Sequence, residues 1–231
     1  MSSFIVGFWS CVFAALGRVS LFSLVRWALP LQGSARFVDA WVLGHLVLSS
    51  LALVVVSCFP KHWVSVPIVV YGVVRVFEIT VYQANVLLFD EYRTIKAGRE
   101  YALEGYRRIV LLLLHNYAEI ITWLACTYTV FADEFVHKWE GGARTVLGGI
   151  YSSFITMTTF GDFNLLPKTN FAAVILLFHA TVGLFMTLLS LARFISLIPA
   201  PKSKDAIELR QLGNQPPSQS LNRTRRTRRS S

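Results

Sequence analysis

Four stretches of the chain are apolar over the length that a helix needs to cross a membrane. The hydrocarbon core of a bilayer is about 30 Å thick and an α-helix rises about 1.5 Å per residue, so about 20 apolar residues are required. The stretches are residues 40–59, 63–89, 109–131 and 171–192. Three charged residues lie within them, Arg75 and Glu78 in the second and Glu119 in the third. The pattern therefore predicts four transmembrane helices.

The N-terminal stretch allows two interpretations. Residues 3–17 are uncharged, but this run is short, and the chain then continues through Arg18 and Arg26 to Pro30. It could be a short span whose arginine reaches the interface, or a helix that lies in the interface. No basic segment precedes the apolar run, so a cleaved signal peptide fits poorly. We favour a span, which makes five.

A further apolar segment is too short to cross. It covers about residues 145–157, inside a long connection between Ala132 and Asn170. A helix over these residues would be about 20 Å long. Such a segment would have to enter the membrane and return on the same side. Backbone at that depth is tolerated only where it is buried in protein or lines water, so the pattern indicates a binding or conduction role.

The composition agrees with a membrane protein. Apolar residues make up 54% of the 231 residues and charged residues 15%, and the mean hydropathy is +0.53. This leaves too little polar surface to cover a soluble globule. The three cysteines lie in apolar stretches without metal-ligand spacing, so we interpret them as small buried side chains.

The net charge of +9 is unevenly distributed. Of the 22 Lys and Arg residues, 17 fall in the tail and in the loops on one side of the predicted spans, and 4 fall on the other side. The positive-inside rule makes the first side cytoplasmic. The basic tail after Pro201 then favours anionic lipid headgroups over nucleic acid, and its end, residues 213–231, has the composition of a disordered segment. Residues 90–108 alternate acids and bases and predict a surface helix.

One motif carries a specific chemistry. Its sequence is Tyr151-Ser152-Ser153-Phe154-Ile155-Thr156-Met157-Thr158-Thr159-Phe160-Gly161-Asp162-Phe163-Asn164-Leu165-Leu166-Pro167. It resembles the pore signature of the potassium channel family, in which Thr-Met-Thr-Thr, an apolar residue and Gly-Tyr-Gly-Asp are followed by two apolar residues and Pro. The first half matches nearly residue for residue, and Pro167 falls in place without a gap.

The resemblance covers about residues 109–197 and implies a fold. It predicts an all-α integral membrane protein of four or five spans, with a re-entrant pore helix and filter loop between the last two. The domains would be residues 1–108 with the N-terminal helices, residues 109–200 with the pore module, and residues 201–231 with the basic tail. Four copies would surround one pore, since each chain supplies one filter strand. The family also has a hinge glycine at the position of Gly183, for which a small residue at a helix contact is the alternative.

The resemblance assigns the selectivity filter to Thr158, Thr159, Phe160, Gly161, Asp162 and Phe163. Threonine hydroxyls and inward-facing carbonyls would replace the water of a monovalent cation. Asp162 and Phe163 stand where the family has Tyr and a second Gly, and Phe cannot easily adopt a glycine conformation. Channels with an Asp after the first filter Gly discriminate poorly between sodium and potassium. An alternative register, with Phe160-Gly161-Asp162 on the Tyr-Gly-Asp end, needs a gap and misplaces Pro167.

The charged residues within the spans are expected to pair. Arg75 and Glu78 are three residues apart on one helix face, and Glu119 could join Arg75 from another helix. A voltage sensor would need several basic residues three apart, so we favour a structural pair. His179 is expected to be a packed, hydrogen-bonded side chain rather than a pH sensor.

These patterns predict a homotetrameric cation channel of the cell membrane, with a cytoplasmic C-terminus and without a cofactor. We find no nucleophile–base pair and expect no enzyme activity. The main alternative is a channel-like subunit that does not conduct and regulates or assembles others, since a degenerate filter fits that role. A transporter is a weaker alternative, because it would predict a second broken helix in an internal repeat.

Overall fold

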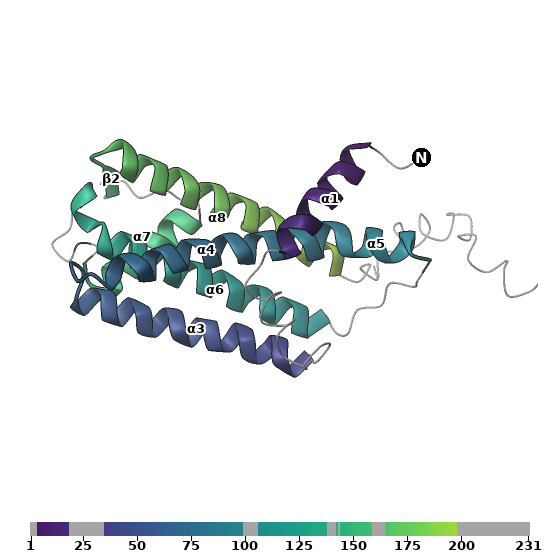
Figure 1. Cartoon of the computed structure of the whole chain (residues 1–231), viewed down its shortest axis with the longest axis horizontal. Coiled ribbons are helices and arrows are strands. Elements are labelled where there is room, and N and C mark those ends of the chain that lie inside the picture. The colour runs from purple at the N-terminus through teal and green to yellow at the C-terminus, as the bar shows by residue number, and fades with distance from the viewer. Residues whose placement is uncertain are drawn as a thin grey trace, which may run out of the picture. The chain divides into compact units, whose positions relative to one another are not determined.

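The computed structural model describes residues 4–18, 35–98, 106–137, 142, 144–158 and 165–197. All of them except Leu197 belong to one compact unit, Met1–Ser196. The described chain is mostly helical, as the sequence predicted (Figure 1).

Four helices are long and apolar enough to cross a membrane. They are α3 (Ala35–Cys58), α4 (Ser65–Ala84) with the π-helical segment η1 (Asn85–Phe89) that continues it, α6 (Tyr106–Val130) and α8 (Asn170–Leu197). They correspond to the four predicted stretches. Each is a few residues longer or shorter than its apolar run, because a helix continues for as long as its backbone is hydrogen-bonded rather than stopping at the first polar side chain.

The predicted fifth span is not among them. Helix α1 (Phe4–Arg18) has 15 residues and is about 22 Å long, which is shorter than the hydrocarbon core. It packs against α4 and η1 at the end of α4 where α5 begins (Figure 1). Its outward side chains Phe4, Phe8 and Trp9 are exposed.

The predicted surface helix over residues 90–108 is shorter in the structure than expected, and its residues 99–105 lie outside the described residues. Helix α5 (Asp90–Lys96) has seven residues, and Gly98 then adopts a positive φ of 71°. This left-handed conformation favours glycine and ends the helix. Residues 106–108 already belong to α6.

The described part of the connection between α6 and α8 contains one 3₁₀-helical turn, one α-helix and two short strands. The order is η2 (Ala132–Glu134), β1 (Phe135–His137), α7 (Val146–Met157) and β2 (Leu165–Pro167). Strands β1 and β2 pair antiparallel, with Phe135 opposite Pro167. The ladder closes the connection where it leaves α6 and where it returns to α8. These strands are an addition to the predicted all-α fold.

Asp133 ties this end of the molecule together. Its carboxylate pairs with Arg144 before α7 and lies 3.5 Å from Nζ of Lys61 in the α3–α4 loop. Its backbone carbonyl accepts a hydrogen bond from Nζ of Lys168 at 3.0 Å. These exposed contacts join the α3–α4 loop to the connection between α6 and α8 at the end of the bundle, although each exposed pair is worth less than about 1 kcal/mol.

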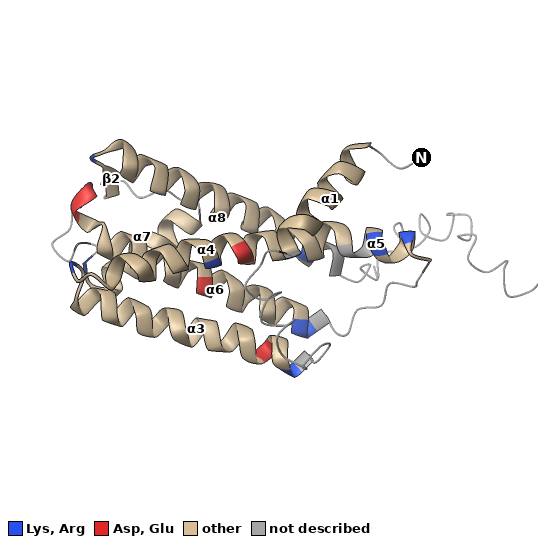
Figure 2. Ribbon diagram, viewed as in Figure 1, with Lys and Arg blue, Asp and Glu red and all other residues tan. Residues whose placement is uncertain are grey.

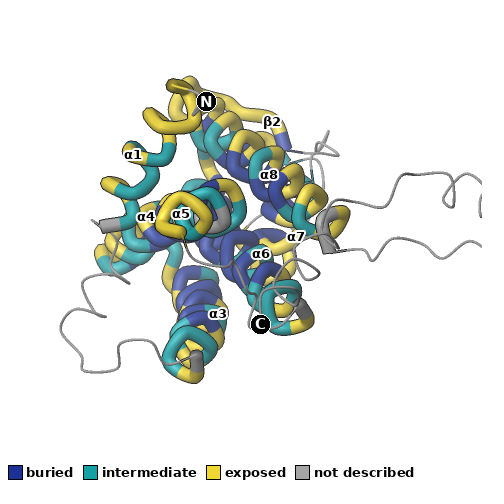
Figure 3. Tube along the Cα trace, turned by 90° about the vertical axis from the view of Figure 1, so that its right-hand side faces the viewer, coloured by how far each residue is buried: buried dark blue, intermediate teal, exposed yellow. Residues whose placement is uncertain are grey.

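Helix α6 lies at the centre of the bundle. It packs against α3, α4 and α7, as Figure 3 shows in a view along the helices. Trp123, Leu124 and Ile120 of α6 are fully or almost fully buried in the core. Gly72 of α4 permits close packing there, since a Cβ at this position would lie 2.8 Å from the Trp123 ring. The arrangement makes α6 the support for both the N-terminal helices and α7.

Candidate functional site

Helix α7 begins with a side-chain cap. Thr145 has extended backbone angles, and its Oγ1 accepts a hydrogen bond from the Gly148 N–H at 3.0 Å. Such a cap satisfies one of the free N–H groups of the first turn and stabilises a helix by about 1 kcal/mol. The structure therefore gives α7 nearly the predicted extent, residues 145–157, with Thr145 as the cap rather than the first helical residue.

Small residues of α7 bring it against α6. A Cβ at Gly149 would lie 2.5 Å from Oγ1 of Thr129 and 3.1 Å from the Ala125 carbonyl oxygen. One turn later, the Ser153 hydroxyl donates to the Ile121 carbonyl oxygen at 2.7 Å. The contact positions advance along α7 while they retreat along α6. The two helices are therefore antiparallel, and α7 extends from the end of α6 back towards its middle.

The last turn of α7 lies between the middles of α6 and α8. The Tyr117 hydroxyl donates to the Met157 carbonyl oxygen at 3.3 Å and lies 3.4 Å from Oγ1 of Thr187. A Cβ at Gly183 would lie 2.6 Å from the same carbonyl oxygen. Tyr117 and Gly183 are each about half-way along their own helices. Helix α7 has 12 residues, about 18 Å, so it covers part of the length of its neighbours and stops there.

Of the predicted filter residues, the described part of the chain contains Thr158. It caps the C-terminal end of α7, and its hydroxyl lies 3.0 Å from the Phe154 carbonyl oxygen and 3.1 Å from that of Ile155. Thr159, Phe160, Gly161, Asp162 and Phe163 lie outside the described residues. Their role as a filter stays a prediction.

Gly183 has a clear packing function. Helix α8 is unbroken through this position, and the main chain of Met157 occupies the space that a side chain would need. This is the close approach that a small residue at a helix contact provides. A hinge is a statement about motion, and it stays a prediction.

Sequence reasoning did not assign a role to three residues of this site, Tyr117, Gly149 and Ser153. Gly149 and Ser153 are spaced four apart, as small residues at a helix contact are, and this spacing was a usable signal. Tyr117 had no comparable signal, because its partners come from α7 and α8.

His179 of α8 is buried beside α7. It is 0% exposed, and its Nδ1 lies 2.9 Å from the Tyr128 hydroxyl oxygen. The prediction of a packed, hydrogen-bonded histidine is confirmed. Within the described residues its Nε2 has no hydrogen-bond partner, and neither has the hydroxyl of Ser152 in α7. Unpaired polar atoms therefore lie on both α7 and α8.

A cluster of three charged side chains joins α4 to α6. Arg75 donates through Nη1 to Oε2 of Glu78 at 2.7 Å and through Nε to Oε1 of Glu119 at 2.8 Å. The three side chains are 6% exposed or less. Figure 2 shows charged residues within the middle part of α4 and α6, away from the charged residues at the helix ends. The predicted pairing of Arg75 with both acids is confirmed.

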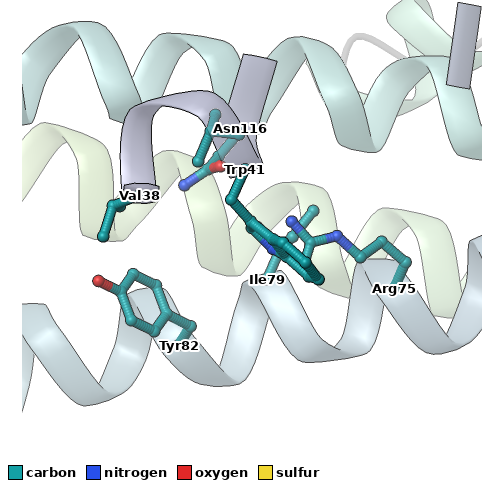
Figure 4. Close-up of a pocket in the computed structure, with 7 residues that line it drawn as sticks. Val38, Trp41, Arg75, Ile79, Tyr82 and Asn116 are labelled. Carbon is teal, nitrogen blue, oxygen red and sulfur yellow. The ribbon is translucent and has the colours of Figure 1, made fainter. Parts of the chain in front are cut away.

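Aromatic side chains complete the surroundings of this cluster. Nε1 of Trp123 donates to Oε1 of Glu119 at 3.3 Å, and the guanidinium carbon of Arg75 lies 5.7 Å from the Trp41 ring centroid. Figure 4 shows the Trp41 indole beside Arg75, in a small pocket that Tyr82 and Asn116 also line. Cation–π contact stabilises a desolvated guanidinium by up to about 2 kcal/mol. The cluster contains two carboxylates for one guanidinium.

His45 lies close to the cluster but has other partners. Its Nδ1 lies 2.9 Å from the Trp41 carbonyl oxygen and its Nε2 lies 3.0 Å from the Tyr71 hydroxyl. A carbonyl only accepts, so the proton is on Nδ1, and Nε2 accepts from Tyr71. Both ring nitrogens are satisfied in the neutral form.

The described residues contain no group of three or more His, Cys, Asp or Glu side chains that could bind a metal ion. No protein-family model, curated protein or solved structure matches the chain. Its function is therefore inferred from the sequence and the geometry of the site.

Proposed function

We propose that the chain is one subunit of a tetrameric cation channel of the cell membrane. The pore would be formed by α6, α7, the filter residues 158–163 and α8. The observation that carries the proposal is the position of α7. This helix starts at the end of α6 and stops at the middle of α6 and α8, against Tyr117 and Gly183. A re-entrant pore helix has this position.

The end of α7 supports a role with cations. The C-terminal end of a helix has a partial negative charge and carbonyl groups without intrahelical partners. A cation beside this end is stabilised, and the effect is larger where water is excluded. The residues that follow α7, Thr159 to Gly161, are those that would supply a hydroxyl and inward-facing carbonyls.

The exposed apolar side chains support assembly in a membrane. Leu147 and Phe154 of α7 are 69% and 49% exposed in the single chain, and Leu177 of α8 is 69% exposed. Large apolar side chains that are this exposed are not expected to face water in the assembled protein. In a tetramer, neighbouring subunits or lipid would cover them.

The filter sequence supports weak discrimination among cations. Asp162 and Phe163 replace the outer Tyr and Gly, which leaves fewer carbonyl sites in line. Four Asp162 carboxylates near the outer mouth would attract cations and repel anions. We therefore propose selectivity for monovalent cations over anions, with little preference for potassium over sodium.

The N-terminal helices are proposed to support the pore module rather than to sense voltage. Arg75 is fully engaged with Glu78 and Glu119, and this fixes α4 to the central helix α6. The basic tail is proposed to be cytoplasmic and to contact anionic headgroups, so nucleic acid is not the proposed partner.

A flux assay on purified protein in liposomes tests the proposal. Wild-type protein should release potassium and sodium at similar rates and chloride much more slowly. The double substitution Asp162→Tyr with Phe163→Gly restores the family pattern and should increase the preference for potassium. A strongly potassium-selective wild type would refute weak discrimination. Absence of flux in both proteins would favour the second candidate, a non-conducting regulatory or assembly subunit, for which the degenerate filter is the specific observation.

A further inference from the structure

A cavity of about 520 Å³ lies between α1, α4 and the π-helical segment η1. This volume is typical of a ligand pocket, about 300–1,000 Å³. Most of its wall is apolar and is formed by residues such as Leu16 of α1 and Phe77 and Val81 of α4. Arg93 of α5 and Asn85 of η1 line it as well. The cavity is therefore apolar along α1 and α4 and polar where Arg93 lies.

Arg93 has hydrogen-bond partners but no counter-charge among the described side chains. Its guanidinium donates to the Ser10 hydroxyl at 3.3 Å, to the Ser10 carbonyl at 3.2 Å and to Oδ1 of Asn85. The Phe89 ring lies 5.7 Å from its guanidinium carbon. These groups are neutral, and Arg93 is half-buried. A partly desolvated guanidinium with neutral partners is a favourable site for an anionic oxygen, above all for a phosphate.

The local backbone positions these groups. The π-helical turn at Asn85–Phe89 interrupts the α-helical register between α4 and α5, and such segments occur frequently at functional sites. Gly17 of α1 approaches Asn85 closely, since a Cβ there would lie 3.0 Å from Nδ2. The Phe13 and Phe89 rings, 5.5 Å apart, hold α1 against the same turn.

The place of the cavity along the chain indicates the source of the ligand. Arg93 follows directly on the long apolar helix Ser65–Phe89, at the end that the Lys and Arg distribution makes cytoplasmic. It therefore lies at the depth of headgroups of the inner leaflet, which contains the anionic lipids. The exposed rings of Phe8 and Trp9 on α1 agree with an interfacial position of this helix.

Glu78 sets the orientation of the ligand. Glu78 lines the cavity at a distance of seven residues, or about 10 Å along the helix, from Asn85. Its carboxylate is paired with Arg75. The carboxylate of Glu78 would repel the phosphate of a ligand at this end of the cavity, whereas Arg93 would attract it. We propose that the cavity binds one anionic phospholipid of the inner leaflet, with its phosphate at Arg93 and an acyl chain between α1 and α4. This site is separate from the pore.

Native mass spectrometry of the full-length protein in mild detergent tests the proposal. Delipidated protein is incubated with dioleoyl phosphatidylglycerol or dioleoyl phosphatidylcholine, and the retained lipid is counted per chain. Arg93→Gln should lower the retention of phosphatidylglycerol about tenfold, as expected for the loss of a charge-assisted hydrogen bond. Lys96→Gln is the matched control, because it removes the same charge from the exposed end of α5.

A second variant tests the acyl-chain part of the site. Ala14→Trp fills the cavity without changing any charge, and it should also reduce phosphatidylglycerol retention. Inorganic phosphate should not displace the lipid. Competition by phosphate together with unchanged binding to Ala14→Trp would show a free-anion site and overturn the lipid proposal.

Two further outcomes would also overturn it. One is equal retention of the two lipids by the wild-type protein, a result that does not depend on any variant folding. The other is an equal loss in Lys96→Gln and Arg93→Gln, which would show general attraction to basic residues. Arg93→Lys keeps the charge and should retain most of the preference, which separates loss of the phosphate contact from loss of the fold.

Discussion

Replacing Arg75 with glutamine would leave two buried carboxylates close together without the guanidinium that now lies between them. Because the cluster contains two carboxylates and one guanidinium, replacing Arg75 and replacing either glutamate should have different effects on stability. Without Arg75, Glu78 and Glu119 both lose the guanidinium that balances their charge, whereas Glu78→Gln or Glu119→Gln leaves one acid and one base in a neutral pair. Arg75→Gln should therefore destabilise the protein much more than either glutamate substitution.

The size of the effect follows from the burial of the cluster. Removing one partner of a buried ion pair typically costs about 3–5 kcal/mol, because it leaves an uncompensated charge. For a chain of this size each kcal/mol lowers Tm by about 2–4 °C, so Arg75→Gln should lower Tm by about 6–20 °C. Glu78→Gln exchanges a charged for a neutral hydrogen bond, which costs about 1 kcal/mol or about 2–4 °C.

Thermal unfolding in mild detergent, followed by tryptophan fluorescence, measures these shifts. Lys61→Gln is a suitable control, since it also removes a cation that lies near a carboxylate, but at a site where Lys61 and Asp133 are 77% and 63% exposed. Its Tm should change by less than about 4 °C. The double variant Arg75→Gln with Glu119→Gln should recover part of the stability lost in Arg75→Gln.

Equal Tm values for Arg75→Gln and the Lys61→Gln control would contradict this expectation, because the buried ion pairs would then contribute nothing measurable. A loss of stability in Glu78→Gln and in Glu119→Gln that equals the loss in Arg75→Gln would contradict it as well. That result would show that each acid is needed for its own charge and would contradict the two-to-one count.

Three further predictions concern the pore module and the tail. Gly183→Ala should cost about 1–3 kcal/mol in thermal unfolding, since its Cβ would meet the Met157 carbonyl, while Gly44→Ala, with open space around it, should cost little; equal effects would contradict the contact. Asp162→Asn should reduce cation flux, most at low salt where screening is weak, and a salt-independent effect would argue against an electrostatic role. Truncation after Arg210 should leave the oligomer and the flux intact, and loss of either would assign the tail a role in the pore.

Apolar runs predict the long helices because crossing a membrane requires both length and apolar side chains. The same reasoning gave α7 nearly its full extent, since the cap at Thr145 and the end at Met157 are local features. The pairing of Arg75 with Glu119 could also be predicted, because a buried charge needs a partner.

Other features depend on contacts that the sequence pattern does not contain. The strands Phe135–His137 and Leu165–Pro167 are too short for an alternating pattern, and they exist because the connection closes on itself. Trp123 and Trp41 lie in apolar helices where the aromatic side chains that face the charges look like those that face outwards. The π-helical turn at Asn85–Phe89 and the cavity beside it lie where α1 packs against α4 and η1, and the sequence pattern did not indicate that contact.

The central claim is that each chain supplies one of four filter strands around a single pore. Chemical cross-linking of the purified protein in mild detergent tests it most directly. The account predicts a ladder of cross-linked species that ends at four chains. A ladder that ends at two would contradict it, because two strands cannot surround a dehydrated cation with enough oxygen ligands.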